Sequence, residues 1–199
     1  AKTALHVAAF CGDAEICERL IVAGGDVAAR DFDGRRALDL AAALGRGEIC
    51  RILLKHGAGM ETASADGAGP LHLAVAAPSS DAVVALIEAG ADLEARAADG
   101  RTALELAAGL GRVESCLALA AAGAAVRPDA ISRAANTRIR RLLEAARHPE
   151  GRRRVRRCWR RRWRARAASA HERVLIARAY RRRFADEPAL DQAVASMPE

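Results

Sequence analysis

One stretch of thirteen residues recurs along the chain at a fixed interval of 33 residues. At residues 99–111 it has the sequence Asp-Gly-Arg-Thr-Ala-Leu-Glu-Leu-Ala-Ala-Gly-Leu-Gly, and related copies begin at residues 66 and 33. A fourth, partial copy opens the chain at residues 1–9. A constant period of this length without insertions is typical of stacked supersecondary units, and not of one globular core.

Several positions within the period hold the same type of residue in every copy. Three such positions are occupied by Leu5, Leu38, Leu71 and Leu104, by Leu20, Leu53, Leu86 and Leu119, and by Gly24, Gly57, Gly90 and Gly123. Agreement at several independent positions fixes the register. The repeats are therefore placed at about residues 1–32, 33–65, 66–98 and 99–126.

Each copy predicts a tight turn followed by two helices. The Asp-Gly pair favours a turn, because glycine accepts a positive φ and aspartate bonds to its own local backbone. Thr3 and Thr102 are suited to cap the first helix, and Pro70 is suited to its first position. The second helix is expected at residues 14–23, 48–56, 81–89 and 114–122, where apolar residues recur at helical spacing.

The pattern resembles the ankyrin repeat. The family signature, an Asp-Gly turn and then T-P-L-H-x-A-A, is found as Thr-Ala-Leu-His-Val-Ala-Ala at residues 3–9, and the later L-L-x-x-G-A-D as Leu-Ile-Glu-Ala-Gly-Ala-Asp at residues 86–92. The resemblance covers about residues 1–126. It implies an all-α solenoid of stacked helix pairs with short β-turn fingers, whose function is non-enzymatic binding of another protein.

Some copies depart from the family pattern. Arg36 and Gly69 replace the capping threonine, and Asp39 and Glu105 replace the histidine. These changes bear on local rigidity around the second and third repeats, and not on the fold.

The resemblance also implies a partner surface made of the turn tips and the inner helices. Carried over by position, its residues are Arg30, Phe32, Arg35, Arg36, Arg96 and Arg101 on the turns, and Phe10, Leu44 and Leu110 on the inner helices. Phe32 is the expected anchor, because aromatic and arginine side chains dominate interface energies; the alternative is that it packs against its own turn. The middle turn, residues 63–65, offers only alanine and serine.

The cysteines and histidines favour structural roles. Cys17, Cys50 and Cys116 share one position, where the third copy has Val83, so this position is expected to be small, apolar and buried. One cysteine per repeat does not give the paired, closely spaced ligands of a zinc site. Reduced thiols favour an intracellular protein, cytoplasmic or nuclear.

No arrangement of residues predicts an enzyme. The two histidines of the repeat signature, His6 and His72, are expected to bond to neighbouring backbone, and no serine, cysteine or carboxylate stands in a catalytic pattern with them. No glycine-rich loop of the phosphate-cradling type is present. We therefore expect no catalytic residue, no metal and no cofactor.

Charge divides the chain into two parts. Residues 147–199 contain 16 arginines and six acidic residues, a net charge of +10, whereas residues 1–146 carry −3. The 33-residue period ends after Gly123, and residues 127–146 are expected to form an amphipathic cap that closes the stack. The ankyrin-like domain is therefore placed at residues 1–146 and a basic tail at residues 147–199.

The basic tail supports three hypotheses. Ten of residues 152–166 are arginine, and none is acidic. The tail is a solvated, disordered charge run, or a basic helix that binds a calmodulin-like protein in an apolar groove, or a segment that binds the phosphates of nucleic acid or of an anionic membrane. The residues expected to make these contacts are Val155, Trp159, Trp163, Arg160 and Arg161.

We expect the chain to be a fragment of a longer protein, and we expect no membrane-spanning segment in it. No charged-then-apolar leader is present, and the longest apolar run, residues 117–126, is too short to span a bilayer. The first repeat lacks its leading Asp-Gly turn, so we expect further repeats or another domain before it. We expect the chain to be a monomer.

Overall fold

The computed structural model describes residues 2–61 and 67–166 of the chain. The predicted tip of the middle finger, residues 63–65, and the end of the tail, residues 167–199, lie outside the described residues. The chain divides into two compact units, residues 1–159 and residues 160–199.

Ten of the described helices form five consecutive pairs within the first unit. They are α1 (Ala4–Cys11) and α2 (Ala14–Val22), α3 (Ala37–Ala43) and α4 (Gly47–Lys55), α5 (Pro70–Ala76) and α6 (Asp81–Glu88), α7 (Ala103–Gly109) and α8 (Val113–Ala122), and α9 (Pro128–Ser132) and α10 (Thr137–Arg147). A further helix, α11, spans Pro149–Arg166. The predicted second helices of the four repeats are confirmed, with ends that differ by at most one residue.

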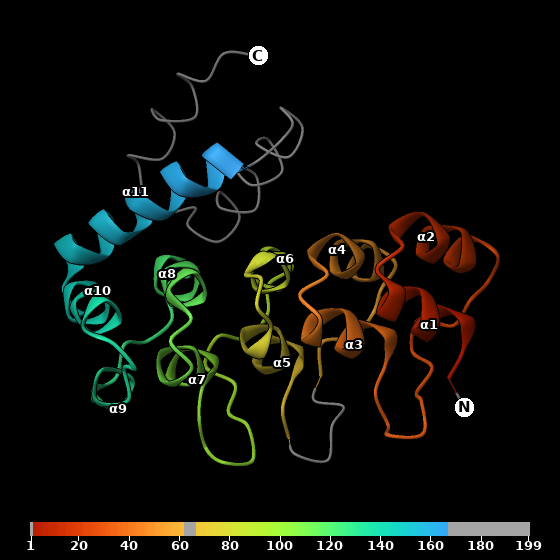
Figure 1. Cartoon of the computed structure of the whole chain (residues 1–199), viewed down its shortest axis with the longest axis horizontal. Coiled ribbons are helices and arrows are strands. Elements are labelled where there is room, and N and C mark those ends of the chain that lie inside the picture. Colours follow the sequence, from red (N-terminus) through yellow and green to blue (C-terminus); the bar gives the residue numbers. More distant parts are fainter. Residues whose placement is uncertain (1, 62–66, 167–199) are drawn as a thin grey trace. The chain divides into compact units, whose positions relative to one another are not determined.

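The helix pairs stack in two layers (Figure 1). The odd-numbered helices α1 to α9 pack on one another in chain order and form the inner layer, and α2 to α10 form the outer layer in the same order. The loop between α2 and α3 and the loop between α6 and α7 project beyond the inner layer as fingers (Figure 1). Within the described residues the one β-bridge joins Arg96 and Thr102 at the base of a finger. The all-α solenoid with short β-turn fingers is therefore confirmed.

The repeated leucine and glycine positions have the roles that the sequence predicts. The repeated leucines of the inner helices, from Leu5 to Leu104, are buried. At the repeated position of the outer helices Leu53, Leu86 and Leu119 are fully buried, and Leu20 is half-buried. The repeated glycine at the end of each outer helix has a positive φ, for example 100° at Gly123, a conformation that other L-residues rarely adopt.

At the N-termini of α1, α3 and α7 the residue three positions after the capping residue accepts the backbone N–H of that residue. Thr3 N donates to His6 Nδ1 (3.2 Å), and Thr102 N donates to Glu105 Oε2 (3.3 Å). In the second repeat Arg36 N donates to the Asp39 carboxylate (2.8 Å). The carboxylates that replace histidine therefore preserve this bond.

Histidine also connects neighbouring repeats. His6 Nε2 lies 3.0 Å from the carbonyl oxygen of Arg35, and His72 Nε2 lies 3.1 Å from that of Arg101. Because Nδ1 of His6 accepts a hydrogen bond from the Thr3 backbone N–H, Nε2 carries the ring hydrogen and donates a hydrogen bond to the carbonyl oxygen of Arg35. In the second repeat the Arg36 guanidinium makes the matching contact to the next finger, at the carbonyl oxygen of Glu61.

The predicted cap at residues 127–146 is a complete fifth helix pair. Pro128 begins α9, and the Asn136 side chain caps α10 by accepting the N–H of Ile139 (2.9 Å). α9 packs on α7, and α10 packs on α8, as in the other repeats. Ile139 and Leu143 are fully buried, whereas Arg138 and the other arginines of α10 are exposed. The stack therefore ends on a pair whose outward side is charged.

Candidate functional site

The predicted contact residues of the inner helices share one edge of the inner layer. Phe10, Leu44 and Leu110 stand at the C-terminal ends of α1, α3 and α7 and are exposed. Packing does not require them to be apolar, because their side chains meet water. They form an apolar row on the inner helices, and we call it the inner row.

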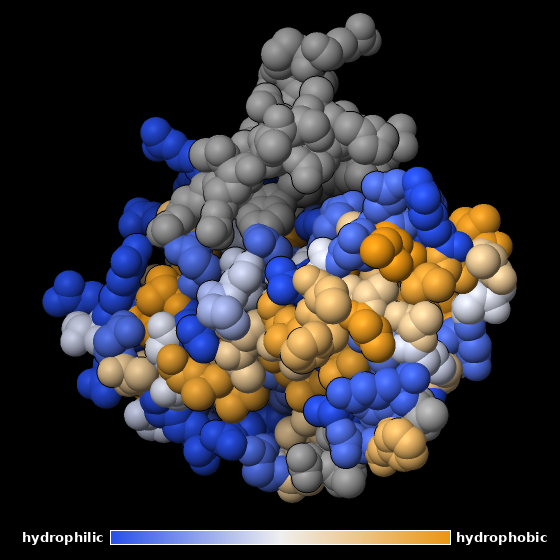
Figure 2. Space-filling view, turned by 45° about the vertical axis from the view of Figure 1, so that its right-hand side comes forward, coloured by the Kyte–Doolittle hydropathy of each residue, from blue (hydrophilic) through white to orange (hydrophobic). Residues whose placement is uncertain are grey.

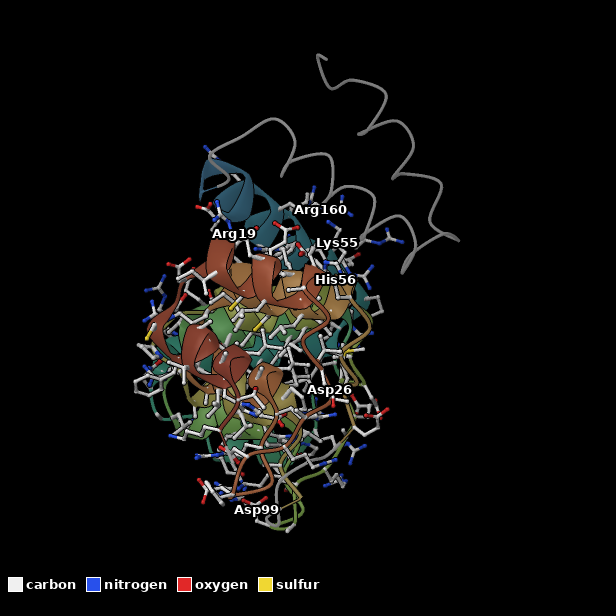
Figure 3. All side chains as sticks on the ribbon, turned by 90° about the vertical axis from the view of Figure 1, so that its right-hand side faces the viewer. Arg19, Asp26, Lys55, His56, Asp99 and Arg160 are labelled. Carbon is white, nitrogen blue, oxygen red and sulfur yellow. The ribbon has the colours of Figure 1, made fainter. Side chains whose placement is uncertain are left out.

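Phe32 lies at the tip of the finger between the first two repeats and is 85 % exposed. The alternative, that it packs against its own turn, is therefore excluded. Figure 3 shows how far this side of the stack lies from the outer helices: Asp99, on the last finger, lies at the opposite end of the view from Arg19 and Lys55 on α2 and α4.

The finger arginines are held by bonds within their own turns. Arg30 Nη1 donates to the carbonyl oxygen of Gly34 (2.9 Å), and Arg96 donates in the same way to Gly100. Arg101 Nε donates to the Asp99 carboxylate (2.6 Å). Their guanidinium groups therefore have fixed positions before any partner arrives.

Asp31 organises the first complete finger. Its buried carboxylate accepts the backbone N–H groups of Asp33 and Arg35, each at 2.9 Å, and it also pairs with the Arg35 guanidinium. Burial acts to raise the pKa of Asp31, but these backbone hydrogen bonds, with the nearby Arg35 charge, together lower it below the ordinary value. The finger that carries Phe32 is therefore a rigid turn around an ionised carboxylate.

Arg36 differs from the other predicted contact residues, because it is buried. Its side chain is 4 % exposed and is enclosed by Asp39, 2 % exposed, and by the carboxylate and backbone of Glu61. A buried guanidinium with these partners offers no surface to another protein. We therefore remove Arg36 from the candidate surface and assign it a structural role.

The first helix pair presents an apolar face that the sequence analysis did not single out. Val7 on α1 is 51 % exposed, whereas Leu40, at the same repeat position on α3, is 8 % exposed. Ile16 and Val22 on α2 are also exposed. Figure 2, with this end of the stack turned forward, shows hydrophobic side chains gathered here. The repeat register, which sets Val7 and Leu40 at one position, is the signal by which sequence reasoning could have compared them.

The start of the basic tail is a helix, so the disordered alternative does not hold for residues 149–166. Val155 and Trp159 are 7 % and 5 % exposed. Arg160 is half-buried and Arg161 is exposed, while the side chain of Trp163 lies outside the described residues. Two of the predicted tail contacts are therefore buried side chains in this structure.

Two arginines of α11 that the sequence analysis passed over make defined contacts. Arg156 Nε donates to the carbonyl oxygen of Ala121 on α8 (3.2 Å), and Arg152 Nε donates to that of Ala146 on α10 (3.3 Å). Their spacing beside Val155 and Trp159 at helical intervals is a signal that sequence reasoning could have used.

The shared cysteine position is confirmed as part of the core. Cys17, Cys50 and Cys116 are fully buried, whereas Cys11 and Cys158 are exposed, and all five are free thiols. Burial raises the pKa of Cys50 and of Cys116 to about 12, and it also raises that of Cys17.

These differences predict how the thiols react with Ellman's reagent at pH 8. The thiolate is the reacting form, so burial and a raised pKa both protect the core cysteines. We expect two thiols, Cys11 and Cys158, to react quickly in the folded protein, and all five to react in denaturant. Rapid reaction of a third thiol in the folded protein would contradict the buried position of the shared cysteines.

Comparison with protein families agrees with the fold and the repeat register. A family model described as "Ankyrin repeats (3 copies)" matches residues 1–64 and again residues 56–129. The chain therefore belongs to the ankyrin repeat family. Repeats of this family are generally modules of protein–protein interaction. A comparison with curated proteins gave no match. None of the helices in the described ranges, 2–61 and 67–166, has the length and apolar character needed to cross a membrane.

Proposed function

We propose that the chain is a non-enzymatic scaffold that binds a partner protein through its fingers and inner row. The observation that carries the proposal is the exposure of Phe32 on a finger held rigid by Asp31. A large aromatic side chain that contributes nothing to the core is costly to leave in water, and aromatic residues are enriched among the strongest contacts of protein interfaces.

The surrounding residues fit a protein partner. The inner row, Phe10, Leu44 and Leu110, provides apolar area, and the arginines of the fingers provide polar contacts at its border. Protein interfaces commonly combine an apolar centre with a polar rim, and preorganised side chains lose less entropy on binding. The fixed guanidinium groups of Arg30, Arg96 and Arg101 therefore support this surface.

The non-enzymatic part of the proposal rests on the histidines. His6 and His72 are buried and bonded to backbone atoms of the next finger, so neither ring is presented to a substrate. We propose further that the protein is a monomer in the cytoplasm or the nucleus. Free thiols at all five cysteines support a reducing compartment.

Replacing Phe32 with alanine tests the proposal. The partner is first recovered by capture with the intact chain, and its affinity for each variant is measured by calorimetry. We expect a loss of about 30-fold, corresponding to about 2 kcal/mol for a central aromatic contact. The melting temperature should not change, because an exposed side chain contributes little to stability.

Two further variants complete this test. Arg35→Ala should also weaken binding, by less than Phe32→Ala, because part of the Arg35 guanidinium is committed to Asp31 and Asp33. Val22→Ala, which removes an exposed apolar side chain from α2, should leave affinity unchanged. Undiminished affinity in both finger variants would remove the fingers from the partner surface.

A second candidate function is binding through α11, with a calmodulin-like protein or a nucleic acid as the partner. The exposure of several arginines along this helix favours it. A calmodulin-like groove would need Val155 and Trp159 to leave their buried positions. Binding of a nucleic acid to the exposed arginines needs no such rearrangement.

A further inference from the structure

The part of α11 within the first unit has two faces of different character. Residues Arg152, Val155, Arg156 and Trp159 are spaced as i, i+3, i+4 and i+7, so they share one side of the helix. Val155 and Trp159 on this side are buried. We call this side the docked face.

The arginines of the docked face act at the ends of other helices. Arg156 donates to Ala121 in the last turn of α8, and Arg152 donates to Ala146 in the last turn of α10. Carbonyl groups in the last turn lack partners within their helix, and the C-terminal end of a helix dipole attracts cations. The docked face therefore joins the first part of α11 to the last turns of α8 and α10 by two charged hydrogen bonds, and Val155 and Trp159 on the same face are buried.

The opposite side of α11 consists of Arg153, Arg154, Arg157 and Cys158, all of which are exposed. Arg153 and Arg157 are one helical turn apart, a rise of about 6 Å. No carboxylate and no large apolar side chain lies among these four residues. The bonds of Arg152 and Arg156 lie on the docked face, and the three guanidinium groups of Arg153, Arg154 and Arg157 lie on the exposed side of the helix. We call them the arginine face.

The composition of the arginine face selects one class of ligand. A membrane surface would favour apolar side chains that insert beside the basic ones, and a protein interface would favour an apolar centre; the arginine face has neither. Guanidinium groups bind phosphate oxygens with two parallel hydrogen bonds. A regular row of phosphates is therefore the ligand that this face fits.

We propose that Arg153, Arg154 and Arg157 bind the phosphate backbone of double-stranded nucleic acid without reading its sequence. This proposal specifies the second candidate function and is independent of the partner surface around Phe32. Binding driven by phosphate contacts releases counterions, so the affinity falls steeply with salt. Trp159 stays buried in the complex, because the docked face takes no part in binding.

The test uses the full chain and a fluorescein-labelled DNA duplex of mixed sequence, with binding measured by anisotropy over a range of salt concentrations. The variant replaces Arg153, Arg154 and Arg157 with alanine. Each lost phosphate contact lowers the salt slope by about 0.9, so we expect the slope to fall by about 2.7. The melting temperature should not change, since these side chains are exposed and alanine favours the helix.

A matched control removes the same amount of charge elsewhere. It replaces Arg19 on α2, Arg46 before α4 and Arg133 after α9, all of which are exposed, and it should keep wild-type affinity and slope. Equal losses in the two triple variants would show that net charge alone drives binding and would overturn the proposal. No binding of the wild-type chain at low salt would also overturn it.

Two other ligands separate this inference from the second candidate function. One is a phosphatidylserine-containing vesicle and the other is calcium-loaded calmodulin, with tryptophan emission as the readout because both tryptophans lie in α11. Binding of calmodulin without binding of duplex would overturn the inference and leave the second candidate function in place. Binding of vesicles alone would assign the arginine face to membranes. Binding of none of the three would overturn both.

Discussion

Replacing Leu71 with alanine should lower the free energy of unfolding by about 2–5 kcal/mol, the usual cost of removing a buried leucine side chain. Leu71 is buried on α5, which packs between α3 and α7. A cavity at this point weakens the interfaces on both sides of the third repeat. Because a solenoid is stabilised by contacts between nearest neighbours, the two halves of the stack should then unfold with reduced cooperativity.

Urea denaturation followed by far-ultraviolet circular dichroism measures this effect. Val22→Ala is the matched control, because it also shortens an aliphatic side chain but at a position that is exposed on α2. We expect the control to change stability by no more than about 0.5 kcal/mol. A denaturation curve for Leu71→Ala that coincides with that of the wild type would mean that the register of the repeats is incorrect.

The second large effect is expected at the buried ion pair of the second repeat. Asp39→Ala should lower the free energy of unfolding by about 3 kcal/mol, because it leaves the Arg36 guanidinium buried without its main partner. This is the lower end of the usual cost, since Glu61 still contacts the guanidinium from its exposed side. The variant also removes the acceptor of the Arg36 backbone N–H.

The first repeat suggests how this loss can be repaired. There the same two positions hold Thr3 and His6, which satisfy the same backbone N–H without a buried charge. The double variant Arg36→Thr and Asp39→His should therefore recover most of the stability that Asp39→Ala loses. Chemical denaturation of the two variants makes the comparison. A double variant that is no more stable than Asp39→Ala would show that the two capping arrangements are not interchangeable.

The parts of the fold that the sequence predicts correctly depend on local or repeated signals. Glycine at the end of each outer helix is required by a positive φ, and the leucine positions are buried because every copy meets the same neighbours. The exposure of Phe32 agrees with the expectation that a residue on a turn tip has little packing to do. The shared cysteine position was predictable because valine replaces it once.

The parts that the sequence did not predict depend on contacts between segments. Arg36 has the position of a finger residue, but its partner Glu61 lies 25 residues later, near the end of the same repeat, and the repeat pattern does not predict this contact. The fifth helix pair has lost the repeat signature, although α9 and α10 pack as the earlier pairs do. Arg156 bonds to the backbone carbonyl oxygen of Ala121. Every residue has such a group, so the residue type at position 121 does not predict the contact.

The contacts of α11 bear on how easily the fifth helix pair opens. Arg152 and Arg156 bond to the last turns of α10 and α8, so α11 adds two hydrogen bonds to the packing of α10 on α8 and α9. In a solenoid each helix pair is held by its interfaces with neighbouring units. Local opening of α10 therefore has to break the bond from Arg152 as well, which raises its free energy and should slow hydrogen exchange of the α10 amides.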